Sequence, residues 1–354
     1  MTQVIPESAN GHAAADTGLP SDAPFAAAPQ PQTPPVSRTP RSRPSGTGAH
    51  ALVGRNAGLM LVYMLVAVLP AVAMGMISAA ESSSPGLALD LDGTRTSIAQ
   101  CVGPIAATIV LLVMRRRQVA DREFWLGASD RRRMTPSSFA ALAVVLIAIG
   151  GLSEAVMAAL KALFALFGVS LTSIALNLID STMNESLLMV VSVVVLAPIT
   201  EEILCRGMMM GDLRERGKMF AIVTPSVLFG MLHGDLLQGL SAAMGGLLLG
   251  YIAMEYSLVW AMVFHFVNNG VLSTWLPMAF GLLPDAAEKP AYYVFLVVGS
   301  VLGLAVLWWR RAAIRDYIAA NRSPRGSYVG WTSLRFLLLV LYCAVVSSAG
   351  FSLM

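Results

Sequence analysis

Ionisable side chains stand out in the central third of the chain, where apolar stretches surround them. Glu201, Glu202 and Arg206 form the first group. On a helix, Glu202 and Arg206 are four residues apart on one face, with the acidic residue first, so we expect them to pair. Glu201 is rotated by about 100° from Glu202 and cannot share that contact equally. One carboxylate is therefore expected to be neutralised and the other to stay available for chemistry.

Two further groups contain the two histidines of the apolar part of the chain. Phe229 and His233 are four residues apart, as are His265 and Asn269, so each pair shares one face of a helix. A carboxylate beside an imidazole can activate water by general base catalysis, and a second imidazole with an amide N–H can hydrogen-bond an oxyanion. Together with Glu201, these side chains could hydrolyse a peptide bond without a covalent nucleophile.

The composition places these groups in a membrane protein. Of the 354 residues, 56% are hydrophobic and 13% are charged, whereas a soluble domain has about 25% charged residues. Ionisable groups at the bilayer centre cost about 2.5–3.5 kcal/mol each and usually face a bundle interior, where they pair or act. The formal net charge of +3 is too small to indicate a nucleic-acid partner. The three cysteines are an odd number without metal-ligand spacing, which argues against a disulfide framework or a zinc ribbon.

We predict an all-α, polytopic membrane helix bundle with about nine transmembrane helices (eight to nine), because apolar runs of about 20 residues recur along the chain. Residues 138–168 could instead hold one span and an interfacial helix. We assign them a single span because this keeps the charge pattern of the later loops consistent. The predicted spans lie near residues 57–79, 97–114, 138–165, 186–206, 219–236, 238–256, 258–280, 292–309 and 334–353.

Residues 1–55 are predicted to form a disordered, proline-rich cytoplasmic tail, because nine of the 19 prolines fall in residues 1–50 among small and polar residues. Residues 56–354 are predicted to form the transmembrane domain. Loops that stay in the cytoplasm are rich in Lys and Arg, so we assign the arginine-rich segments 115–133 and 310–335 to the cytoplasm. The sequence thus predicts a multi-pass protein of the cell membrane with a cytoplasmic N-terminus.

The three groups also resemble the ordered motifs of a known family. EEILCR at residues 201–206 resembles EExxxR, FGMLH at 229–233 resembles FxxxH, and HFVNN at 265–269 resembles HxxxN. These are the motifs of the CAAX prenyl endopeptidase and bacteriocin-processing family, also called CPBP or Abi. The resemblance covers about residues 186–275, the predicted catalytic core, and every motif position is matched in order.

The resemblance implies an all-helical intramembrane peptidase. By similarity, Glu201 and His233 would polarise the attacking water, and His265 and Asn269 would stabilise the oxyanion. The supporting residues would be Glu202, Arg206 and Phe229.

A zinc ion is an open alternative, because Glu201, His233 and His265 could supply the three ligands of a catalytic site with an open fourth position. We favour a metal-free glutamate mechanism that requires no cofactor, because Asn269 suits an oxyanion donor better than a zinc ligand. The HExxH pattern of common zinc peptidases is absent from the sequence. Cys205 could act as a thiol nucleophile, but a buried free cysteine is ordinarily inert.

Two classes of function are compatible with the sequence. The favoured one is an endopeptidase that cleaves a peptide or membrane-associated protein near the cytoplasmic half of the bilayer. The alternative is a non-hydrolytic membrane protein on the same scaffold, either a peptide-toxin immunity protein or a proton-coupled transporter. A transporter is expected to show internal repeats, and the two halves of the sequence show none. The expected partners are the substrate and the lipid bilayer, with no nucleic acid.

Overall fold

The structure is a computed structural model that describes residues 46–82, 92–128, 131–183 and 186–354. Most of the predicted tail, residues 1–45, lies outside the described residues. Residues 46–55 were also assigned to that tail, and this boundary is wrong, because helix α1 (Gly46–Ser82) already begins at Gly46. Ala49 and Val53 on its first turns are fully buried. They pack so closely against Gly330 that a Cβ there would lie 2.6 Å from the Ala49 carbonyl oxygen.

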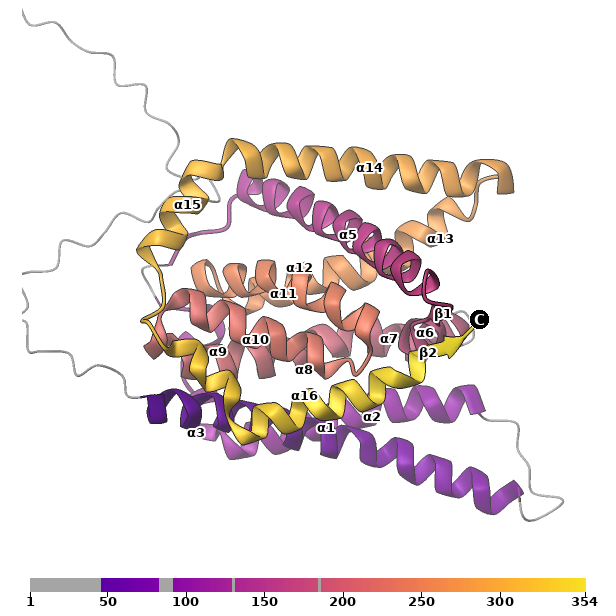
Figure 1. Cartoon of the computed structure of the whole chain (residues 1–354), viewed down its shortest axis with the longest axis horizontal. Helices are drawn as coiled ribbons and strands as arrows, with labels where there is room; N and C mark the ends of the chain where they lie inside the picture. The colour runs from indigo at the N-terminus through magenta and orange to yellow at the C-terminus, as the bar shows by residue number, and fades with distance from the viewer. Residues whose placement is uncertain (1–45, 83–91, 129–130, 184–185) are drawn as a thin grey trace, which may run out of the picture.

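The helices run back and forth between two ends of a bundle (Figure 1). The first three long segments are α1, α2 (Asp92–Met114) and α5 (Pro136–Ala165). The fourth is a continuous path of α7 (Leu187–Val191), π-helix η1 (Ser192–Leu196), α8 (Ala197–Glu202), π-helix η2 (Ile203–Met209) and α9 (Met210–Leu213). Next come α10 (Lys218–Leu232), α11 (Leu236–Glu255), and the path of α12 (Leu258–Phe266), π-helix η4 (Val267–Trp275) and α13 (Leu276–Phe280). The last two are α14 (Asp285–Trp309) and α16 (Leu334–Ser347).

Short elements connect these segments. They are α3 (Arg116–Val119), α4 (Arg122–Leu126), α6 (Ile174–Met183), the 3-10 turn η3 (Arg214–Arg216), α15 (Arg311–Ala320), and the 3-10 turns η5 (Ser327–Thr332) and η6 (Ser348–Gly350). The structure also contains two strands, β1 (Val169–Leu171) and β2 (Phe351–Leu353), which pair antiparallel. The all-α prediction holds for the bundle but missed this small ribbon, because neither three-residue strand carries a local signal and each is defined only by its distant partner.

The predicted helical membrane bundle is confirmed, but fewer helices than predicted are of spanning length. Within the described residues, six helices are long and apolar enough to cross a membrane, and two apolar helices are shorter, namely Lys218–Leu232 and Leu334–Gly350. The remaining predicted span, residues 258–280, is helical but polar at Asn268 and Asn269. Residues 138–165, assigned a single span, lie in one continuous helix.

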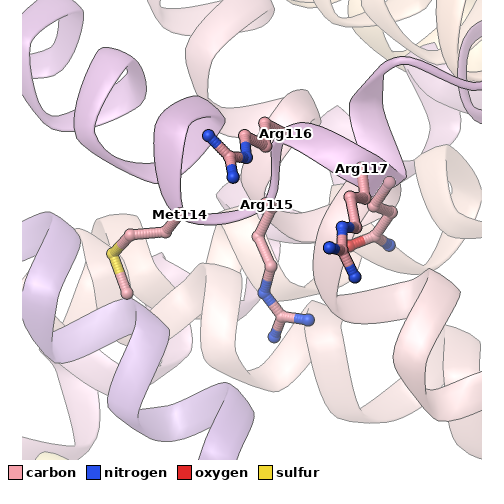
Figure 2. Close-up of a pocket in the computed structure, with 5 residues that line it drawn as sticks. Met114, Arg115, Arg116 and Arg117 are labelled. Carbon is pink, nitrogen blue, oxygen red and sulfur yellow. The ribbon is translucent and has the colours of Figure 1, made fainter.

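Elements α3, α9 and α15 lie at one end of the bundle (Figure 1), and basic residues of α3, η3 and α15 gather there. Figure 2 shows the run from Arg115 to Arg117 at the bend after α2. Arg115 is anchored there by Asp212, at 2.9 Å, and Asp212 also accepts from Arg55 at 3.1 Å. Both arginine-rich segments that were predicted to be cytoplasmic reach this end. A single orientation of the bundle in the membrane can therefore place both of them in the cytoplasm. That orientation stays a prediction.

A polar cluster at the same end joins α10, α11 and α15. The buried carboxylate of Glu255 accepts from Lys218 Nζ and from the Tyr317 hydroxyl, each at 2.7 Å. Burial, together with the charge of Glu255, raises the pKa of Tyr317 well above its usual value. Tyr317 therefore keeps its proton and remains a donor to Glu255, so this carboxylate in α11 links α10 with α15.

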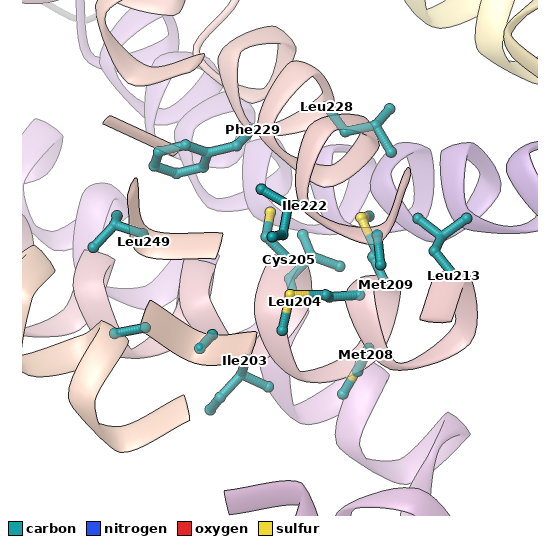
Figure 3. Packing of buried hydrophobic residues seen from close by; sticks show 14 of the residues in the cluster. Ile203, Leu204, Cys205, Met208, Met209, Leu213, Ile222, Leu228, Phe229 and Leu249 are labelled. Carbon is teal, nitrogen blue, oxygen red and sulfur yellow. The ribbon is translucent and has the colours of Figure 1, made fainter. Parts of the chain in front are cut away.

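The helices that carry the first two motif groups pack in the core of the bundle. Figure 3 shows side chains of η2 and α9 packed against α10 and α11. Every residue of η2 is buried, including Cys205, which has no exposed surface. Close packing of this kind leaves little room for alternative side-chain positions, so the core fixes the orientation of the polar groups that it surrounds.

Candidate active site

Glu202 and Arg206 form a fully buried ion pair, as predicted. Arg206 Nη1 lies 2.6 Å from Glu202 Oε1, and the two side chains are 1% and 0% exposed. Arg206 also donates through Nη2 to the Gly246 carbonyl at 3.1 Å, and its guanidinium lies 4.5 Å from the centre of the Phe229 ring. The arginine thus links α11 and α10 to the helix that carries both glutamates.

Glu201 is the carboxylate left available. It projects from α8 into a cavity and its side chain is 17% exposed. Its Oε2 lies 3.8 Å from His265 Nε2. Glu202 is paired with Arg206, whereas Glu201 is not. The observed contacts therefore match the prediction that one carboxylate is neutralised and the other stays available.

His265 lies between the two glutamates. Its Nδ1 is 3.0 Å from Glu202 Oε1, while Nε2 faces Glu201. The spacing of the sequence grouped His265 only with Asn269, and the contacts with the glutamates could not be predicted because they cross between separate helices. An ionised Glu202 can only accept, so Nδ1 carries a proton and donates it to this bond.

His233 caps the C-terminal end of α10. Its Nδ1 is 2.9 Å from the Phe229 carbonyl oxygen. A carbonyl can only accept, so Nδ1 is the donor, and in the neutral ring Nε2 keeps its lone pair. The Phe229 ring makes edge contacts with both imidazoles, with ring centres 5.1 Å from His233 and 5.6 Å from His265. Phe229 therefore orients both rings.

The side chain of Asn269 is held by a hydrogen bond to a backbone carbonyl of the π-helix η1. Its Nδ2 donates to the Val193 carbonyl at 3.0 Å, and its Oδ1 accepts from Asn268 Nδ2 at 3.0 Å. Val193 lies in η1, where the N–H of Ala197 bonds to the Ser192 carbonyl, five residues back. If the same five-residue bonding pattern continued, the Val193 carbonyl would accept from the N–H of residue 198. Residue 198 is proline, which has no N–H. Asn269 supplies the missing donor.

One cavity of about 1350 Å³ joins the predicted catalytic groups. Its lining includes Glu201, His233, His265, Asn268 and Asn269. It extends to side chains that the sequence did not connect with the site, namely Glu154, Asp180, Lys289 and Tyr292. No spacing links these positions, so only the assembled bundle reveals them.

The cavity lies toward one end of the bundle. Its outer lining comes from α6, α13 and the start of α14, which lie at the end of the bundle opposite α3, α9 and α15 (Figure 1). In the predicted orientation this is the external end. The cavity therefore lies toward the end of the bundle opposite the arginine-rich segments. Because the orientation of the chain in the membrane is itself a prediction, the expected cleavage near the cytoplasmic half of the bilayer also stays a prediction.

The predicted zinc ligands do not form a metal site as placed. In the part of the chain that the structure describes, no group of three His, Cys, Asp or Glu side chains could hold a metal ion. Glu201, His233 and His265 line the same cavity but do not converge on one point at ligand distances. Cys205 is enclosed in the apolar core and does not line the cavity.

Residues 183–271 match the family described as Type II CAAX prenyl endopeptidase Rce1-like. The matched segment contains all three motif groups and overlaps most of the predicted core. The resemblance to the CAAX prenyl endopeptidase family is thus confirmed over this segment. The match supports a protease and, with the apolar helices, a multi-pass membrane protein. No curated protein and no solved structure matches the chain.

Proposed function

We propose that this chain is an intramembrane endopeptidase that hydrolyses a peptide bond with a water molecule activated by Glu201 and His233. The observation that carries the proposal is the shared cavity, into which Glu201, His233, His265 and Asn269 all project. The family match supports a peptide or protein substrate in the membrane. No metal ion is required in this proposal.

Water activation would occur beside Glu201. Its carboxylate accepts a proton from the water, and the Nε2 lone pair of His233 orients the water through a second hydrogen bond. The oxygen of the water then bonds to the peptide carbonyl carbon. Glu201 later returns the proton to the leaving amine as the C–N bond breaks, so the carboxylate is regenerated.

The oxyanion would be bound by His265 and Asn269. His265 donates Nδ1–H to Glu202, so donation to the oxyanion from Nε2 requires the doubly protonated ring. Beside that ring Glu202 stays ionised, while Glu201 holds the proton taken from the water. Asn269 uses one Nδ2 hydrogen on Val193 and has a second for the oxyanion. Donors held in place before the reaction contribute most to this kind of stabilisation.

The test compares membrane proteomes of cells that carry the wild type, Glu201→Gln or Glu215→Gln. The control, Glu215, is exposed on η3 and loses the same charge outside the cavity. We expect peptide fragments that appear with the wild type and Glu215→Gln and disappear with Glu201→Gln. A fragment pattern that is identical in all three strains, with equal amounts of each protein in the membrane, would refute the proposal.

A further inference from the structure

A second pocket lies at the arginine-rich end of the bundle. It has a volume of about 270 Å³ and is lined by Met114, Arg115, Arg116, Arg117 and Gln118. Figure 2 shows the three consecutive arginine side chains around the bend between α2 and α3. The lining contains three positive charges and no negative one, so the pocket favours an anion.

The charges of this pocket are only partly balanced by the protein. Arg115 is paired with Asp212, which is shared with Arg55. Within the described ranges, Arg116 and Arg117 have no acidic partner, and both are exposed. Arg115 is therefore fixed in place, whereas two guanidinium groups remain available to bind a ligand. A guanidinium presents a planar fork of N–H donors that matches the oxygens of a phosphate group.

The pocket also lies where a membrane surface is expected. It follows directly after the apolar helix α2, and α14 ends at the same end of the bundle (Figure 1). The exposed Trp308 and Trp309 stack there with Arg311 and Arg310, at 4.4 and 4.1 Å. Tryptophan with flanking arginine is typical of the headgroup layer. A basic pocket at this depth meets lipid phosphates at high local concentration.

The pocket borders the helix that carries the first motif. Gln118, at its edge, donates to the Met208 carbonyl at 3.4 Å. The ring of Phe124 lies so close to Gly207 that a Cβ there would be 2.4 Å from the ring. Elements α3 and α4 therefore cover η2 directly.

We propose that the pocket at the α2–α3 bend binds a phosphate group, supplied by the head of an anionic phospholipid. The proposal does not depend on peptidase activity, because it rests on the charge, shape and position of a site separate from the cavity. Phosphatidylglycerol fits this chemistry because its phosphate charge is not balanced within the headgroup. In phosphatidylcholine a quaternary ammonium balances that charge.

The experiment measures lipid binding to the purified full chain in a neutral detergent by native mass spectrometry. Phosphatidylglycerol, phosphatidylcholine and inorganic phosphate are titrated separately. The test variant is Arg116→Ala/Arg117→Ala, and the matched control is Arg310→Ala/Arg311→Ala, which removes two arginines from the same end outside the pocket. We expect about 30-fold weaker phosphatidylglycerol binding in the test variant, equivalent to ~1 kcal/mol for each arginine near an anionic surface. The control variant should bind like the wild type.

Two further measurements, a competition with inorganic phosphate and a lysine variant, test whether the arginine pocket binds a phosphate group. Inorganic phosphate should compete with phosphatidylglycerol for the wild type, and Arg116→Lys/Arg117→Lys should recover part of the binding because the charge is kept and the fork is lost. Equal binding of phosphatidylglycerol and phosphatidylcholine, or equal weakening in both alanine variants, overturns the proposal. Inorganic phosphate binding without any phosphatidylglycerol binding overturns the assignment to a lipid. If the alanine variant fails to fold, the lysine variant and the competition with the wild type decide the question.

Discussion

Asn269 donates a hydrogen bond through its side chain to the backbone carbonyl of Val193, at 3.0 Å. The two residues lie in different π-helices, η4 and η1. A π-helical turn often occurs at a functional site because it changes which backbone groups remain unpaired. Here the irregular turn, followed by Pro198, exposes a carbonyl that holds the proposed oxyanion donor in place.

The first prediction concerns Pro198. In Pro198→Ala, residue 198 regains an N–H that can bond to the Val193 carbonyl and compete with Asn269. We expect the helix to be as stable as before or slightly more stable, because a proline inside a helix is unfavourable. Peptidase activity should fall about 10-fold or more, because misplaced donors reduce catalysis strongly. Thermal unfolding in detergent and turnover of a cleaved peptide measure the two effects. A stable variant with unchanged activity would contradict the coupling.

The second prediction concerns Asn269. In Asn269→Ala the proposed oxyanion loses a donor, so we expect kcat to fall about 10²–10³-fold. The partly buried Val193 carbonyl also loses its partner, at a cost of about 0.5–1.5 kcal/mol in stability. In Asn269→Asp the carboxylate can accept but not donate when ionised, so activity should be lost as well. Normal kcat in both variants, with substrate in excess, would exclude Asn269 from the oxyanion site.

The third prediction separates the adjacent glutamates. Glu202→Gln leaves Arg206 buried without its charged partner, so we expect a loss of about 3–5 kcal/mol in the free energy of unfolding. Glu201→Gln changes a partly exposed side chain and should keep the stability of the wild type, while activity falls about 10²–10⁴-fold through loss of the general base.

A double variant checks the cause of the instability. Glu202→Leu/Arg206→Met removes both charges, so it should be more stable than Glu202→Gln, because no unpaired charge remains in the core. Thermal unfolding of all three proteins in one detergent gives the comparison. If Glu201→Gln unfolds as readily as Glu202→Gln, the proposed division of roles is wrong.

The fourth prediction concerns metal dependence. The proposed mechanism uses Glu201, His233, His265 and Asn269 without a metal, so activity should survive dialysis against EDTA and 1,10-phenanthroline. Elemental analysis of the active protein provides the control for residual zinc. Stoichiometric zinc in active protein, with activity lost on chelation and restored by added zinc, would favour the three-ligand alternative.

The fifth prediction concerns the contact that places His233. Gly230 in α10 lies against Gly239 in α11, and a Cβ on Gly230 would be 2.5 Å from the Gly239 carbonyl oxygen. Gly230→Ala should therefore separate the helices and cost about 1–3 kcal/mol, with lower activity. The control is Gly75→Ala, where a new Cβ meets nothing within 4 Å. Equal stability of the two variants would show that α10 can shift without cost.

The sequence by itself determined the local geometry of the site. Glu202 and Arg206 pair because residues four apart face each other on a helix, whatever surrounds them. The same rule places Phe229 beside His233. Long apolar runs also determine a helical membrane bundle, because a bilayer requires every backbone polar group to be paired within the segment. The three motifs therefore predicted Glu201, His233, His265 and Asn269, which all line the cavity.

Only the tertiary structure decided how these groups meet. The bond from His265 to Glu202 spans 63 residues, and the bond from Asn269 to Val193 spans 76. Such pairs depend on the rotation and depth of whole helices, which are set by close packing between segments and not by local spacing. The same holds for Glu154 and Asp180 in the cavity lining. Periodicity acts over a few residues, whereas the site is assembled from helices that touch only after the chain has folded.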